Sequence, residues 1–365
     1  MPVPFELIFS QFQSNTTLVS VEPFGNGHIH DTYKLTSREE ASFILQKINK
    51  EIFPDIPALQ SNIEKVIDHI NKQKRNSIHT LKILKSSAGK SYYLDGNGNY
   101  WRVFNFIPGS QTYDRVLSEE HAYEAGKAYG AFQRSFKDFS PTQLHETLPG
   151  FHNIESRLAL FDRSLLENPV KRAAEIKDEI DFLWSRALRM KRILEKGQAG
   201  LIPLRITHND TKINNVLFGK DNKAICVIDL DTVMPGYIHY DFGDAIRTGA
   251  ATADEDEIEF DKMCIDLSLF EAYSKGFLGQ TIGFLNRVEI SELYFAPQLL
   301  TFIIALRFLT DYLNGDVYFK VDHENHNLQR WYAQKQLLLS MEENESEMKQ
   351  IIQRIEKQLI NDYER

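Results

Sequence analysis

Cysteine is scarce in this sequence, since Cys226 and Cys264 are the only two among 365 residues. Two cysteines supply neither a disulfide framework nor a four-ligand zinc site, so we expect a protein of a reducing compartment, the cytoplasm. Basic blocks are missing too, and the formal net charge is −9. An acidic chain without a long run of lysine and arginine is poorly suited to nucleic acid or anionic membranes, and we expect neither as a partner.

Long apolar runs are also lacking, and we expect no segment that spans a bilayer. The first residues, MPVPFEL, have neither the charged nor the apolar region of a signal peptide. The sequence shows no repeats and no low-complexity region. With 42% hydrophobic residues, the chain can bury an ample core, which suits one large domain or two moderate ones.

The sequence pattern divides the chain in two near Pro108-Gly109. The first part alternates short apolar segments with turns such as DGNG at residues 95–98, which is typical of an antiparallel sheet. Strands are expected over residues 17–23, 32–35, 42–48, 81–85, 91–94 and 100–107, with one helix over 56–74. The second part has helical periodicity, and helices are expected over residues 118–136, 154–166, 171–196, 257–276, 290–314 and 327–364.

One stretch, residues 207–231, carries most of the chemical information. It reads THNDTKINNVLFGKDNKAICVIDLD. A His-x-Asp triplet is followed by an Asn five positions after the Asp, and a further Asp closes an apolar run that indicates a buried strand. The residues concerned are His208, Asp210, Lys212, Asn215 and Asp229. This spacing is typical of the catalytic loop of enzymes that transfer the γ-phosphoryl group of ATP.

Each residue type in this loop suits one part of that chemistry. Asp210 would accept or orient the proton of the attacking hydroxyl, and Lys212 would neutralise charge that develops on the transferred phosphoryl group. His208 is expected to hold the loop rather than to act as a base. A polar run of this kind is often only a turn, but the joint occurrence of all these positions favours the catalytic interpretation.

The same stretch predicts a magnesium site. Asn215 and Asp229 offer the hard oxygen ligands that Mg²⁺ prefers. Asp231, two residues further on, is a third candidate, either as the ligand of a second metal or as a side chain that supports the first. ATP and Mg²⁺ are therefore the expected cofactors.

These observations together predict an α+β fold with the bilobal plan of protein kinases. Residues 1–107 would form a small β-rich nucleotide-binding lobe, and residues 108–365 a larger, mostly helical catalytic and substrate lobe. In that plan a glycine hairpin covers the phosphates, a third-strand cation contacts them, a helix glutamate holds the cation, and a hinge strand meets adenine. The candidates are Gly25 and Gly27, then Lys47, with Lys50 as its competitor, then Glu64, which could equally be a surface residue, and then Phe104 and Phe106.

Longer strings in the second part carry a family resemblance. They are HNDTKINN at residues 208–215, IDLDTVMPG at 228–236, YDFGDAIR at 240–247 and ALRFLTDYL at 305–313. Over nearly its whole length the chain resembles the aminoglycoside phosphotransferase and choline kinase-like superfamily, and within it the bacterial N-acetylhexosamine 1-kinases. Its NDTK sequence at residues 209–212 differs from the GDLH sequence that is common at this position in the superfamily.

The resemblance implies ATP- and Mg²⁺-dependent phosphorylation of the anomeric hydroxyl of N-acetylglucosamine or N-acetylgalactosamine, by a monomer or a homodimer. A kinase for choline, homoserine or an aminoglycoside is the alternative. Besides Asp210, the candidate substrate-binding residues are Asp244, Arg247, Arg307 and His30. Arg307 has an alternative reading as an i,i+4 ion pair with Asp311 that supports the fold.

Overall fold

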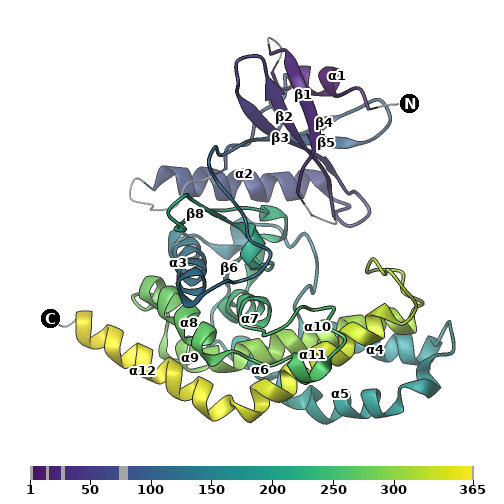
Figure 1. The fold of residues 1–365 in the computed structure, drawn as a ribbon, viewed down its shortest axis with the longest axis vertical. Helices are drawn as coiled ribbons and strands as arrows, with labels where there is room; N and C mark the ends of the chain where they lie inside the picture. Colours follow the sequence, from purple (N-terminus) through teal and green to yellow (C-terminus); the bar gives the residue numbers. More distant parts are fainter. Residues whose placement is uncertain (1–2, 14–15, 26–28, 74–80, 364–365) are drawn as a thin grey trace.

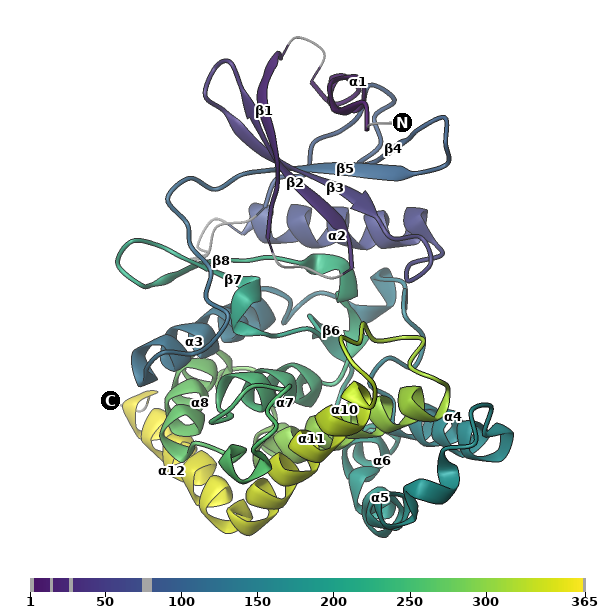
Figure 2. The same ribbon diagram turned by 45° about the vertical axis from the view of Figure 1, so that its right-hand side comes forward.

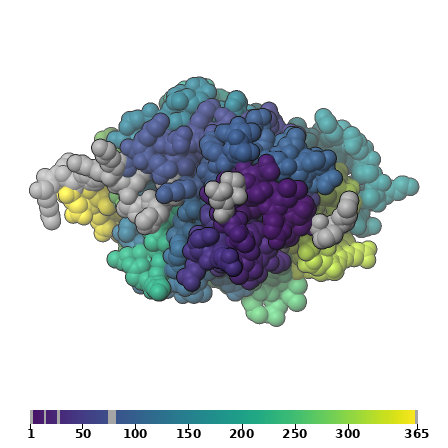
Figure 3. All heavy atoms as spheres, turned by 90° about the horizontal axis from the view of Figure 1, so that it is seen from above, coloured from purple at the N-terminus to yellow at the C-terminus, as the bar shows by residue number. Residues whose placement is uncertain are grey.

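The computed structural model describes residues 3–13, 16–25, 29–73 and 81–363 (Figure 1). A five-stranded sheet lies at one end of the molecule, and a larger, mostly helical part lies at the other. Viewed along the long axis, the sheet end covers the middle of the molecule, and helices of the larger part extend beyond it on both sides (Figure 3). The expected bilobal α+β architecture is observed.

The small lobe is an antiparallel sheet with an apolar layer on each face. Its order is β1 (Leu18–Pro23), β2 (Asp31–Ser37), β3 (Ser42–Ile48), β5 (Tyr100–Asn105) and β4 (Tyr93–Leu94). On the outer face, α1 (Phe5–Ser10) packs Ile8 and Phe9 against Leu35, Leu45, Trp101 and Val103. The inner face packs Ile48 and Phe104 into a second core, which continues through the helices of the larger lobe. Both faces of the sheet are therefore buried, which suits its apolar strands.

Helix α2 (Ile56–Lys72) lies between the sheet and the larger lobe (Figure 1). The helix starts at Asp55, whose side chain accepts the backbone N–H of Ala58 at 2.9 Å, a regular N-cap. The buried Asn62 side chain donates to the backbone oxygens of His145 at 2.8 Å and Val233 at 3.1 Å. These bonds fasten α2 to the larger lobe.

The larger lobe is built around a buried helix. Its helices are α3 (Glu119–Ser135), α4 (Ile154–Glu167), α5 (Lys177–Met190), α6 (Arg192–Gln198), α7 (Ile238–Gly249), α8 (Leu267–Thr281), α9 (Arg287–Ser291), α10 (Ala296–Leu313), α11 (His326–Glu343) and α12 (Glu345–Tyr363). Helix α10 is the central one, with α4, α7 and α11 packed around it (Figure 2). Two short antiparallel pairs face the small lobe: β6 (Arg205–Thr207) with β9 (Met234–Gly236), and β7 (Val216–Phe218) with β8 (Ala224–Val227).

The structure corrects several expected elements. Residues 81–85 were expected to form a strand, but they form only a single bridge, between Ile83 and Phe104 of β5. The few backbone hydrogen bonds that this segment makes to β5 do not continue into a regular ladder. The helix expected over 171–196 is divided into α5 and α6, and the one expected over 257–276 begins at Leu267. Helices α1 and α7 were not expected. The lobe boundary at residue 107 stays a prediction.

One segment is longer and more apolar than we expected from the sequence. Residues Arg287–Leu313 are long and apolar enough, by composition, to cross a bilayer, but 89% of their most apolar window is buried inside the protein. The segment comprises α9 and the central α10, so core packing accounts for its apolar character.

Helices α3 and α8 approach so closely that glycine is required at their contact. A Cβ atom on Gly276 would lie 2.1 Å from the backbone oxygen of Tyr123, and one on Gly126 would lie 2.2 Å from that of Tyr273. We expect Gly276→Ala to lower the free energy of unfolding by roughly 1–3 kcal/mol, because the two backbones must separate. Thermal or urea unfolding measures the change.

Gly279→Ala is the matched control for this prediction. Gly279 lies on the same helix, but a Cβ atom there would meet nothing within 4 Å. Alanine favours a helix over glycine by up to about 1 kcal/mol, so this variant should be as stable as the parent or more so. Equal loss in both variants would show that the close approach of α3 and α8 is not the cause.

Candidate active site

Asp210 is the centre of the loop between β6 and β7. The Asn215 Nδ2 donates to the backbone oxygen of Asp210 at 2.9 Å and to its carboxylate at 3.1 Å. The Lys212 Nζ lies 3.6 Å from the other carboxylate oxygen. The charge of Asp210 raises the pKa of Lys212, so that side chain stays protonated. The loop thus brings a carboxylate, an amide and an ammonium group together.

Asp229 follows β8 and faces the same group of charges. Its backbone has φ +61°, in the left-handed region that a non-glycine residue seldom adopts. The Asp229 side chain is exposed to solvent, although protein atoms crowd around it. These surrounding atoms and the neighbouring carboxylates of Asp231 and Asp210 raise its pKa above the ordinary value. A carboxylate in such surroundings is stabilised in its charged form by a cation.

His208 lies beneath the loop and is fully buried. Its Nε2 is 2.9 Å from the backbone oxygen of Ile228, next to the predicted metal ligand Asp229. Its own backbone oxygen accepts the Thr232 hydroxyl at 2.6 Å. His208 therefore connects the catalytic loop with the segment that carries Asp229, and its ring is not directed at a substrate space.

A buried carboxylate on α7, Asp241, holds the loop from behind. It accepts the backbone N–H groups of His208 at 2.9 Å and Asn209 at 2.8 Å, and the Gln133 Nε2 at 2.6 Å. The Thr211 hydroxyl donates to the backbone oxygen of Asp241 at 2.7 Å. Burial raises the pKa of Asp241 to about 6, although His208 and these donors lower it. Sequence reasoning missed this residue, because only the tertiary structure brings α7 under the loop.

This pKa predicts a pH dependence of the activity. Below about pH 6 a proton on Asp241 competes with the N–H groups that fix the loop, so activity should fall. Stability runs the other way: a raised folded-state pKa adds stability below the ordinary value of 3.8, and that stability is lost as the pH rises through about 6.

Gln133→Met tests this assignment. Removing a hydrogen bond to the ionised carboxylate should raise the Asp241 pKa and move the acidic limb of kcat upward by about 1 pH unit. The pH profile of kcat gives the shift, with the exposed Gln143→Met as control. An unmoved limb would mean that another group controls the acid side.

Two predicted substrate residues, Asp244 and Arg247, also lie under the loop. Asp244 accepts the backbone N–H of Thr211 at 3.0 Å and the Arg247 Nη2 at 3.0 Å. Arg247 is buried and also bonds Glu255 at 2.5 Å. The structure brings both residues close to the loop, but their side chains are engaged in hydrogen bonds to Thr211, Glu255 and each other. Their contact with a substrate stays a prediction.

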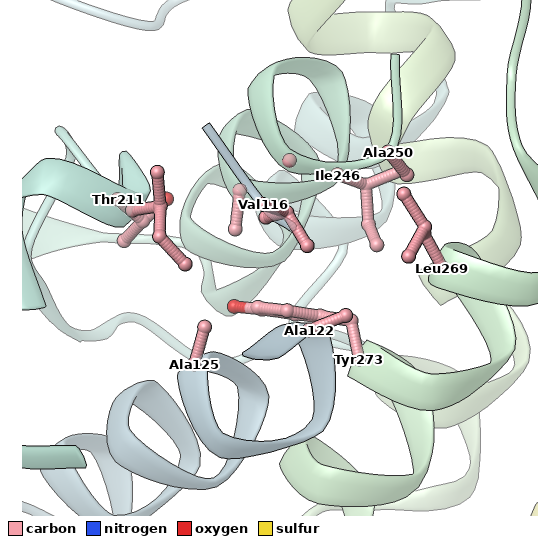
Figure 4. A pocket seen from close by; sticks show the side chains of 11 residues that line it. Val116, Ala122, Ala125, Thr211, Ile246, Ala250, Leu269 and Tyr273 are labelled. Atoms are coloured by element: carbon pink, nitrogen blue, oxygen red, sulfur yellow. The ribbon is translucent and has the colours of Figure 1, made fainter. Parts of the chain in front are cut away.

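A small apolar cavity lies beside Thr211. Side chains of α3, α7 and α8 line it, and Figure 4 shows Tyr273 lying across it between Thr211 and Ala125. The buried Tyr273 hydroxyl has no hydrogen-bond partner among the described residues. The lining is apolar, so this cavity does not suit a sugar or a nucleotide.

The predicted nucleotide-site residues are distributed over both faces of the sheet. Side chains alternate along a strand, and the register places Lys47 beside Trp101, on the outer face that packs against α1. The Lys47 Nζ lies 3.8 Å from Asp31. Glu64 instead pairs with Lys85, at 2.5 Å. The expected pair of Lys47 and Glu64 is therefore not formed.

The remaining nucleotide candidates lie near the inner face or beyond the described residues. Gly25 has φ +78°, the left-handed backbone that glycine favours, whereas Gly27 lies outside the residues that the structure describes. Phe104 is buried on the inner face. Phe106 is half-buried, and its ring centroid lies 6.0 Å from that of Phe24 beside the glycine turn. Whether these residues meet adenine stays a prediction.

Sequence reasoning also missed Arg102, the cation on the inner face of β5. Its guanidinium donates to both oxygens of Asp231, at 2.5 Å each. His30, a predicted substrate residue, lies 3.4 Å from the same carboxylate. An arginine in the middle of the apolar strand YWRVFN was the available signal, since a buried arginine needs an acidic partner.

Comparison with known proteins agrees with the architecture. The family model described as "Phosphotransferase enzyme family" matches residues 20–267. An aminoglycoside phosphotransferase structure from Alicyclobacillus acidocaldarius is similar at 13% identity, with a TM-score of 0.58, and covers 99% of this chain and 98% of that chain. A microcompartment-associated aminopropanol kinase is similar at 13% identity, with a TM-score of 0.59, and covers 94% of this chain and 97% of that chain.

An amicoumacin kinase, solved with AMP-PNP and Ca²⁺, is similar at 14% identity, with a TM-score of 0.57, and covers 92% of this chain and 93% of that chain. At these identities the likeness shows the fold alone, and it confirms the kinase-like bilobal prediction. The match to the family model covers well over half of the sequence. The chain therefore belongs to the phosphotransferase enzyme family, as the resemblance of its loop strings predicted.

Proposed function

We propose that this protein transfers the γ-phosphoryl group of ATP to the anomeric hydroxyl of an N-acetylhexosamine. One observation carries the reaction type: Asp210 is bonded by Asn215, lies 3.6 Å from the Lys212 Nζ, and is near enough to Asp229 for its charge to raise the pKa of that carboxyl. These residues supply a proton acceptor, a cation and two oxygen ligands, as phosphoryl transfer requires. The sugar and its anomeric position are supported by the resemblance of the 208–215 and 240–247 strings to N-acetylhexosamine 1-kinases.

In this proposal the chain contributes mainly by positioning. Asp210 orients the acceptor hydroxyl and takes its proton, and the Asn215 amide fixes the direction of that carboxylate. Lys212 offsets the negative charge of the transferred group. Asp241 and His208 hold the loop rigid, which is needed because phosphoryl transfer depends on alignment within fractions of an ångström.

The residues present fit a magnesium ion. The Asn215 Nδ2 is used on Asp210, while its side-chain oxygen carries no hydrogen bond among the described residues. Asp229 lies among other carboxylates that favour a cation. No group of three His, Cys, Asp or Glu side chains suited to a metal occurs in the described part of the chain; Mg²⁺ is commonly held by one or two carboxylates plus substrate phosphates. When bound, it would offset charge on the phosphate oxygens.

In this proposal we take a pair of arginines near the loop, Arg307 and Arg157, as part of the acceptor side, where they would favour a neutral substrate over a cationic one. The Arg307 guanidinium lies 5.1 Å from the Phe151 ring and 5.5 Å from the Tyr318 ring. Burial and the neighbouring Arg307 lower the pKa of Arg157 to about 10. His152 connects this group to the loop, because its Nε2 is 3.0 Å from the backbone oxygen of Asn209. Choline and aminoglycosides carry positive charge and would be repelled here.

A substrate panel tests the proposal. We expect ATP with N-acetylglucosamine or N-acetylgalactosamine to give ADP and a sugar 1-phosphate, with little turnover of choline, homoserine, 1-amino-2-propanol or an aminoglycoside. Phosphorus NMR distinguishes a 1-phosphate from a 6-phosphate by coupling to the anomeric proton. Reactions without Mg²⁺ and with the Asp210→Asn variant are the controls.

The outcomes separate the parts of the proposal. A 6-phosphate product would keep the kinase chemistry and contradict the anomeric position. Preferred turnover of an amino alcohol or an aminoglycoside would contradict the argument from Arg307 and Arg157. ATP turnover that is indifferent to every acceptor would contradict the proposed transfer itself.

A further inference from the structure

A buried polar cluster joins the two lobes beside the proposed metal site. Arg102 and Asp231 are 1% and 3% exposed, and they come from β5 and from the segment that follows β8. Their bidentate contact is the geometry in which a guanidinium and a carboxylate bind most strongly. The cluster crosses from the sheet to a position two residues after Asp229.

The sheet holds the Arg102 side chain in this direction. The strand register aligns Thr32, Gln46 and Arg102 on neighbouring strands. Gln46 donates to the Thr32 hydroxyl at 3.1 Å, and its oxygen accepts the Arg102 Nε at 2.9 Å. With Nε fixed in this way, the two terminal nitrogens of the guanidinium point at Asp231. A row of hydrogen bonds therefore runs through the sheet into the larger lobe.

His30 supplies a second contact from the small lobe to the same carboxylate. Its Nδ1 accepts the backbone N–H of Asn49 at 3.0 Å, so the proton of a neutral ring resides on Nε2. That Nε2 lies 3.4 Å from the Asp231 Oδ2. Arg102 and His30 therefore both contact the Asp231 carboxylate from the small lobe, two residues after the proposed metal ligand Asp229.

The residues that fill this role in the general kinase plan are arranged differently here. Lys47 lies on the outer face of β3, and its inward-facing neighbour is the uncharged Gln46. Glu64 is engaged by Lys85, and both side chains are partly exposed to solvent. Among these positions, Arg102 is the cation that reaches the metal segment.

We infer that Arg102 is a positioning residue: through Asp231 it holds the left-handed turn at Asp229 in place, so that the affinity for magnesium-bound nucleotide depends on a side chain of the small lobe. This inference rests on the proposed function, because it takes Asp229 as the metal ligand. Asp231 then serves as an anchor for the turn rather than as a second metal ligand. Partners that orient metal ligands typically change metal affinity by about 10- to 100-fold.

Calorimetric binding of AMP-PNP with and without Mg²⁺ tests the inference. In the wild type, Mg²⁺ should tighten binding, and in Arg102→Met this gain should fall by about tenfold or more, while Mg²⁺-free binding stays close to that of the wild type. Arg102→Lys should recover only part of the gain, because an ammonium group cannot bond both carboxylate oxygens in a plane. Arg38→Met, the same change at an exposed position of the small lobe, is the control.

A second variant covers the case in which Arg102→Met fails to fold. Gln46→Met removes no charge and acts on Asp231 only through Arg102, so it should reduce the Mg²⁺-dependent gain in the same direction by a smaller factor. If Arg102→Met folds and keeps the full Mg²⁺-dependent gain in AMP-PNP affinity, the inference is overturned while the proposed function stands. If Arg102→Met does not fold, the same result in Gln46→Met overturns the inference. A wild-type chain whose AMP-PNP affinity ignores Mg²⁺ would overturn the proposed function together with it.

Discussion

Asp210→Asn is expected to reduce turnover by on the order of 100- to 10,000-fold, the range for a positioned acid–base group. The amide that replaces the carboxylate accepts no proton from the attacking hydroxyl. It also places an N–H group or a single oxygen where the Asn215 Nδ2 now meets a carboxylate oxygen at 3.1 Å. The measurement is kcat at saturating ATP and acceptor.

Nucleotide binding should survive this substitution nearly unchanged. Asp210 contacts Asn215 and Lys212 within its own loop, and removing its charge lessens the crowding of carboxylates around Asp229. Calorimetry with AMP-PNP checks this point, and the exposed Asp261→Asn is a matched control. An Asp210→Asn variant with wild-type kcat would contradict the assignment of Asp210 as the proton acceptor. A variant that loses nucleotide binding would show that the Asp210 carboxylate has a role other than proton transfer.

Asp229→Ala is expected to lower activity by roughly 100-fold or more at low Mg²⁺, because a metal that offsets phosphoryl charge contributes several kcal/mol to the transition state. Asn215 remains as an oxygen ligand, so raising the Mg²⁺ concentration should restore part of the activity. Titration of the rate with Mg²⁺ in the wild type and in the variant measures the shift in the half-maximal concentration.

Asp231→Ala should mainly reduce stability, whereas Asp229→Ala should mainly reduce activity. It leaves Arg102 buried without its carboxylate, and breaking a buried pair in this way costs roughly 3–5 kcal/mol of stability. We expect a lower unfolding temperature with a smaller loss of activity in the fraction that folds. If folded Asp231→Ala loses far more activity than Asp229→Ala, the two metal carboxylates have been assigned in reverse.

Local sequence signals were sufficient for α2, for most strands of the sheet and for the candidate catalytic loop, but not for α1 and α7. The period of the 56–72 segment and its Asp55 cap define α2, and the loop residues follow one another within a few positions. For Asp210, Lys212 and Asn215, short sequence spacing ensures proximity, whatever the rest of the fold. The boundaries of longer helices were less certain, because tertiary packing decides where a helix such as α8 begins.

Residues that act across long sequence distances could not be found in this way. Strand alternation separates Lys47 from Gln46, but it does not say which face of the sheet meets the larger lobe. Both faces of this sheet carry apolar side chains, since α1 covers one and α2 the other. The choice of Lys47 as an inward cation had no local signal against it.

The sequence by itself predicted the family and the proposed phosphoryl-transfer chemistry, because the candidate catalytic and metal-binding residues lie on one short loop and directly after the strand that follows it. Only the tertiary structure decided what holds those groups. Asp241 supports the loop from a helix more than 30 residues away, at 2.9 Å from the backbone of His208, and Arg102 reaches Asp231 across 129 positions. Such contacts depend on how the lobes pack, and the free energy that fixes them comes from burial of the whole core rather than from neighbouring residues.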